Sequence, residues 1–87
     1  MSIEKHEPVI KVKGETIIVQ VGEIIHPMSE AHLIEWVELE ADGKIERKNL
    51  KPNDQPIVEF KIPAGTKTII AREHCNLHGT WESKKEL

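Results

Sequence analysis

With 87 residues, a net charge of −3 and a single cysteine, the chain is expected to form one domain over residues 1–87. The negative charge disfavours nucleic acid as the main partner, because phosphate binding needs a basic face. One cysteine excludes an internal disulfide framework. Neither a membrane-spanning apolar run nor a signal-peptide pattern is present, so the cytoplasm is the expected location.

Short runs rich in β-branched and apolar residues recur along the chain, separated by turn formers such as Gly14, Gly22 and Pro27. In chain order these runs are PVIKV, ETIIVQV, PIVEFKI and TKTIIAR. Between two alternating stretches, Asp42 and Gly43 supply the positive φ angles that a tight hairpin turn needs. Regularly spaced short strands with turn signals predict an all-β sandwich or barrel.

The segment Ser29–Ala41, SEAHLIEWVELEA, is ambiguous between helix and strand. Its strong helix formers and the spacing of its apolar residues fit a helix, but the same residues also alternate as in a strand. Local propensity favours the helix, whereas the surrounding β pattern and the Asp-Gly turn that follows favour the strand. We therefore predict one helical turn over residues 28–31 and a strand from about His32.

Histidines are the most informative residues, and the chain has five: His6, His26, His32, His74 and His78. His26 and His32 bracket the turn HPMSEAH, and His78 follows Cys75 by three positions. A C-x-x-H spacing across a tight turn lets a thiolate and an imidazole reach the same ion. His6 lies ahead of the first predicted strand, where it can close such a site from the other end of the chain.

Strand alternation separates His74 from this group. His74 and Cys75 are neighbours, so in extended chain their side chains face opposite ways. Taken singly, each histidine is more often a surface or packing residue than a ligand, and Cys75 alone is more often a buried inert thiol. The coincidence of two local pairs with a fifth donor favours a metal site made of four histidines and Cys75.

The donor set distinguishes between metals. A structural zinc site is closed by four ligands, usually with more thiolates. Blue copper uses two histidines, one cysteine and a weak axial methionine, and no methionine follows Cys75 in CNLHGTWESKKEL. Iron accepts five such donors and keeps a sixth position open, which points to redox chemistry on a small oxygen species.

Four stretches, EKHEP, HPMSEAHLIEW, LKPND and AREHCNLHGTW, resemble the iron-binding domain of superoxide reductases, the desulfoferrodoxin and neelaredoxin family. The resemblance extends from Glu4 to Trp81. It implies an immunoglobulin-like β-sandwich, here of about seven short strands, with one iron per chain that cycles between Fe²⁺ and Fe³⁺. The ligands implied by the matching motifs are His6, His26, His32, Cys75 and His78.

The resemblance also implies an activity, the one-electron reduction of superoxide to hydrogen peroxide. Glu4 would occupy the open iron position in the oxidised state, and Lys5 would draw in the superoxide anion at the mouth of the site. A positively charged side chain steers an anionic substrate even on a protein of negative net charge. The implied electron donor is a rubredoxin-like protein, and the implied assembly a homodimer or homotetramer.

The sequence departs from the family pattern in two ways. His74 stands where tyrosine is common, and one cysteine cannot supply the second, four-cysteine iron site of desulfoferrodoxins, so a one-iron form is expected. The alternative function is a non-catalytic metal-binding or electron-transfer sandwich of the cupredoxin kind. The position of the methionines disfavours that alternative.

Overall fold

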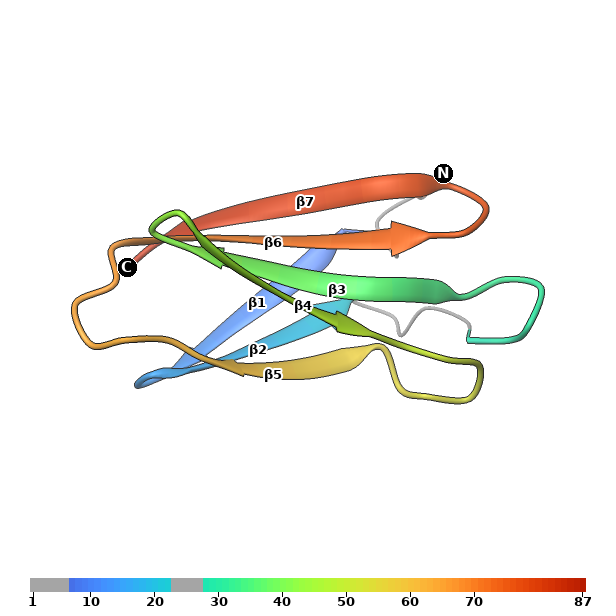
Figure 1. Cartoon of the computed structure of the whole chain (residues 1–87), viewed down its shortest axis with the longest axis horizontal. Helices are drawn as coiled ribbons and strands as arrows, with labels where there is room; N and C mark the ends of the chain where they lie inside the picture. Colours follow the sequence, from blue (N-terminus) through green and yellow to red (C-terminus); the bar gives the residue numbers. More distant parts are fainter. Residues whose placement is uncertain (1–6, 23–27) are drawn as a thin grey trace.

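The computed structural model describes residues 7–22 and 28–87 and shows an all-β protein (Figure 1). In chain order the described strands are β1 (Pro8–Lys13), β2 (Thr16–Val21), β3 (Ile34–Ala41), β4 (Lys44–Asn49), β5 (Ile57–Lys61), β6 (Thr68–Cys75) and β7 (Gly79–Glu86). The described residues include no helix that is long and apolar enough to cross a membrane.

The strands form two antiparallel sheets. One has the order β1-β2-β5 and the other the order β4-β3-β6-β7. The β3–β4 hairpin turns at Asp42 and Gly43, which have φ angles of 47° and 92°, as the Asp-Gly pair predicts. The expected all-β sandwich of about seven short strands is therefore confirmed.

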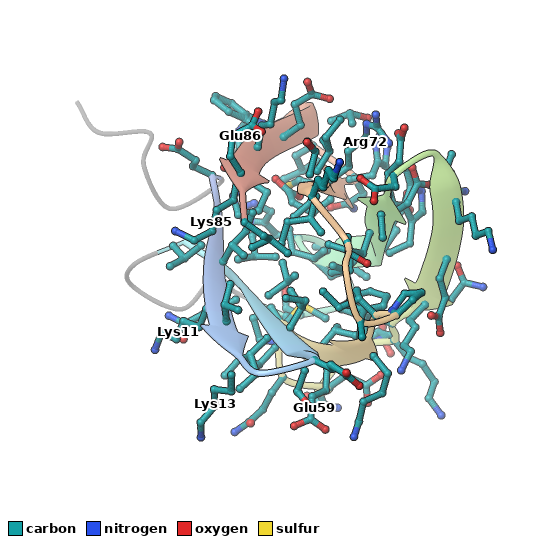
Figure 2. All side chains as sticks on the ribbon, turned by 90° about the vertical axis from the view of Figure 1, so that its left-hand side faces the viewer. Lys11, Lys13, Glu59, Arg72, Lys85 and Glu86 are labelled. Atoms are coloured by element: carbon teal, nitrogen blue, oxygen red, sulfur yellow. The ribbon has the colours of Figure 1, made fainter. Side chains whose placement is uncertain are left out.

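The core lies between the two sheets and follows from the period-two alternation of the strands. On β2 the inward residues Ile17, Val19 and Val21 are fully buried, and Phe60 of β5 packs with them. On β6 the buried positions alternate strictly with half-buried ones up to Cys75. Charged side chains, among them those labelled in Figure 2, lie on the outside of the sandwich.

The predicted helical turn at residues 28–31 is wrong, and the strand begins at Ile34 rather than at His32. Ser29 and His32 instead exchange backbone hydrogen bonds of 3.0 and 3.3 Å, and the His32 N–H also reaches the Ser29 hydroxyl at 3.1 Å. These bonds close a tight loop. Serine hydroxyls compete with helical hydrogen bonding in this way.

Candidate metal centre

Three of the predicted ligands converge at one end of the sandwich. His32 lies in the loop before β3, Cys75 is the last residue of β6, and His78 belongs to the turn that joins β6 to β7. Both connections lie at the right-hand end of the molecule in Figure 1. Potential ligand atoms of the three residues all lie within 4.8 Å of one another.

The separation of the Cys75 and His78 donor atoms fits a shared ion. The Sγ atom of Cys75 lies 3.7 Å from Nδ1 of His78, and the rings of His32 and His78 are 5.2 Å apart at 70°. An ion bonded to nitrogen at about 2.1 Å and to sulfur at about 2.3 Å separates such donors by roughly 3 to 4.4 Å. Imidazole and thiolate together favour a transition metal such as iron, copper or zinc.

Burial changes steadily across the cluster. Cys75 is fully buried, His32 is half-buried and His78 is exposed. The thiol therefore lies in the low-dielectric core, while the imidazole of His78 brings the cluster to the surface. An ion held here would be anchored from inside the sandwich and approachable by a small solute from the side of His78.

His74 lies on the other face of β6, as strand alternation predicts. Its ring stacks on Trp36 with centroids 5.7 Å apart, and its Nδ1 shares a 2.9 Å hydrogen bond with the Thr80 hydroxyl. Its Nε2 lies 3.5 Å from a carboxylate oxygen of Glu35. The side chain thus packs on the outside of the four-stranded sheet, away from Cys75.

The turn after Cys75 contains a residue that sequence analysis missed. Asn76 makes hydrogen bonds to the residues on both sides of His32, 43 and 45 positions earlier in the chain. The turn is also held by Trp81, whose Nε1–H donates to the His78 carbonyl at 3.2 Å. Nothing local in the sequence marks the partners of Asn76, because they come from a distant loop.

Glu73 is a second missed residue, and it is fully buried. It faces the core of the sandwich two residues before Cys75, in register with Val37 on β3 and Trp81 on β7. Neither carboxylate oxygen has a hydrogen-bond partner among the described residues. Burial raises the pKa of Glu73 from 4.5 to about 8, because the charged form loses its hydration. Strand alternation already places Glu73 on the same face of β6 as Cys75.

The remaining predicted site residues lie outside the described part of the chain. They are the two further ligands and the two residues expected to act on substrate: His6, His26, Glu4 and Lys5. The structure therefore brings together His32, Cys75 and His78 and leaves the rest of the ligand set as a prediction.

Comparison with known proteins assigns the chain to a family. The family model described as Desulfoferrodoxin matches residues 1–84, nearly the whole chain. This chain is a member of the desulfoferrodoxin family. A similar family member is the desulfoferrodoxin of Nitratidesulfovibrio vulgaris, which is 51% identical over 81 residues, or 93% of this chain and 63% of that protein. The family resemblance inferred from the four sequence motifs is thereby confirmed.

Solved structures of proteins named superoxide reductases share this fold. The superoxide reductase of Treponema pallidum superimposes with a TM-score of 0.86 at 41% identity, over 92% of this chain and 64% of that one. The superoxide reductase (1Fe-SOR) of Giardia intestinalis gives 0.87 at 28% identity, over 98% and 100%. This desulfoferrodoxin chain spans about 62–63% of the length of three curated relatives that it matches, all named as desulfoferrodoxins or a desulfoferrodoxin homolog.

Proposed function

We propose that this protein is a superoxide reductase, which reduces superoxide by one electron to hydrogen peroxide. The observation that carries the proposal is the convergence of His32, Cys75 and His78 at an exposed end of the sandwich. Desulfoferrodoxin family membership and structural neighbours named superoxide reductases support it. The reaction consumes one superoxide, one electron and two protons for each hydrogen peroxide formed.

The proposed cofactor is one mononuclear non-haem iron per chain. Its ligands are the three converging residues together with His6 and His26, which leaves the sixth position open. Iron held by these residues supplies the electron for the reaction. The Cys75 thiolate is a strong electron donor whose hydrogen bonds and burial would tune the reduction potential.

Two residues that precede β1 in the sequence, Glu4 and Lys5, would handle the substrate. The Lys5 ammonium would attract the superoxide anion and would organise water that supplies protons for the hydrogen peroxide formed. The Glu4 carboxylate, an oxygen donor, would occupy the open iron position in the oxidised state. Both roles follow from charge and from the Glu-Lys-His motif that precedes β1.

Three further features belong to the same proposal. The electron donor is a rubredoxin-like protein, the chain associates as a homodimer or homotetramer, and the protein works in the cytoplasm. They are supported by the resemblance of the sequence motifs to the family. Chemical cross-linking or sedimentation of the purified protein measures its oligomeric state directly.

The stoichiometry of the reaction tests the function. Superoxide added to the reduced, iron-loaded protein should disappear with one hydrogen peroxide formed for each superoxide consumed and no dioxygen released. A dismutase would form half as much hydrogen peroxide and release dioxygen. Cys75→Ser is the matched control, since it changes a single ligand atom. Protein that takes up copper rather than iron, or consumes no superoxide, would support the cupredoxin-like alternative instead.

A further inference from the structure

Asn76 bonds to both residues that flank His32. Its side-chain Oδ1 accepts from the Leu33 N–H at 3.0 Å, and its Nδ2 donates to the Ala31 carbonyl at 3.0 Å. Its backbone N–H donates to the Leu33 carbonyl at 3.1 Å. One residue of the Cys75–His78 turn therefore holds the peptide groups on either side of a proposed ligand from another loop.

This bonding replaces a regular part of the β ladder. Ile34 pairs with Cys75, so Leu33 and Asn76 are the next opposed positions, and in a regular ladder the Leu33 N–H would donate to the backbone carbonyl of Asn76. Here the Leu33 N–H donates to the side-chain Oδ1 of Asn76 instead. The backbone carbonyl of Asn76 is released, so the chain can turn at once and bring His78 back toward Cys75.

We propose that Asn76 is a positioning residue for the metal centre, which fixes the His32 loop against the Cys75–His78 turn before any ion binds. The inference rests on the proposed metal-binding function. A primary amide is required because it offers one acceptor and one donor on the same short side chain. Aspartate would place a carboxylate oxygen against the Ala31 carbonyl, and alanine would lose both bonds.

A ligand that is already held in place loses little conformational freedom when the ion binds. The His32 loop is closed on itself by the bonds between Ser29 and His32, but the bonds of Asn76 attach it to the turn that carries the other two donors. Without them the loop must be ordered at the moment of binding. Loss of such an outer partner weakens metal affinity by about 10- to 100-fold in other sites.

A double-mutant cycle tests whether Asn76 acts through His32. Co²⁺ is titrated into metal-free protein and followed by its thiolate absorption band. Asn76→Ala should weaken Co²⁺ binding about 10- to 100-fold. The same change in a His32→Ala background should weaken it by less than about threefold, because the positioned ligand is already gone. Asn49→Ala, the same substitution on exposed β4, should leave affinity unchanged. Unchanged affinity in Asn76→Ala, or equal losses in both backgrounds, would overturn the inference.

The contact itself is tested without a metal. In the metal-free protein, hydrogen exchange of the Leu33 amide should be slow and should become at least about tenfold faster in Asn76→Ala, but not in Asn49→Ala. Unchanged exchange would refute the positioning role whatever the metal does. If the unsubstituted protein bound no Co²⁺ while Leu33 exchange responded as expected, the proposed function would fail, and the role of Asn76 would be reduced to fastening two loops, which also overturns the inference.

Discussion

Replacing Glu73 by glutamine tests whether the buried Glu73 carboxyl group, two residues before Cys75, is protonated in the folded protein. The pKa of the buried carboxyl is about 8, compared with 4.5 in the unfolded chain. Below pH 4.5 both states hold the proton. As the pH rises toward 8 the unfolded chain releases it while the folded protein keeps it, so the free energy of unfolding falls. Each pH unit in this window lowers it by about 1.4 kcal/mol.

The expected change in unfolding free energy follows from the pH range between the two pKa values of Glu73. Between pH 4.5 and pH 7 the wild-type protein should lose about 3 kcal/mol of unfolding free energy through Glu73. The Glu73→Gln variant has no ionisable group there and should not show this loss. The two stability curves should therefore separate by about 3 kcal/mol as pH rises, a difference of 10 °C or more in Tm for a chain of this size, by the rough scaling of small domains.

Urea unfolding of the metal-free proteins at several pH values measures the difference, with tryptophan fluorescence as the signal. Removing the metal matters because a bound ion adds its own pH-dependent stabilisation. Glu46→Gln, the same substitution on exposed β4, serves as the control and should parallel the wild type. If wild type and Glu73→Gln show parallel curves from pH 5 to pH 8, the carboxyl is not protonated in the fold and the reasoning from burial is wrong.

Three further predictions concern Lys5, His74 and Arg72. Lys5→Ala should lower the second-order rate with superoxide and flatten its dependence on ionic strength; an unchanged salt dependence would contradict electrostatic steering. His74→Ala should retain one iron per chain by metal analysis, and loss of iron would mean that this histidine belongs to the centre. Arg72→Met removes one of two guanidinium partners of buried Glu38 and should lower the unfolding free energy by about 1–3 kcal/mol in urea titrations. Lys84→Met, at an exposed ion pair, should change it by under about 0.5 kcal/mol.

Most of the fold was predictable because its signals are local. The turn at Asp42 and Gly43 and the alternation along β2 and β6 depend on neighbouring residues alone. The helical turn at residues 28–31 was wrong for the same reason. Its helix formers favour a helix locally, but the closed loop between Ser29 and His32 is attached to distant chain by Asn76, which local propensity does not register.

The part of the candidate site that lies between His74 and His78 was predictable from the sequence. The C-x-x-H spacing placed Cys75 and His78 together, and alternation on β6 turned His74 away from them. His32 joined them in the sequence only through the coincidence of histidine pairs, because its loop comes from a different part of the chain, and the structure places it beside Cys75 and His78. Glu73 lies on the same inward face of β6 as Cys75, and strand alternation would have identified it as a buried carboxyl group.

Three irregular features of the described chain lie near the metal donors. The β3–β6 register shifts between Ile34 and Trp36, next to the loop of His32, and a side-chain amide replaces a backbone acceptor at Asn76. Glu73 is buried and has no hydrogen-bond partner among residues 7–22 and 28–87, whereas Glu38 on the outer face is paired with two arginines. Departures from local rules are expected where a sequence serves function. Their position beside His32 and Cys75 is the pattern that a metal-binding site at this end of the sandwich predicts.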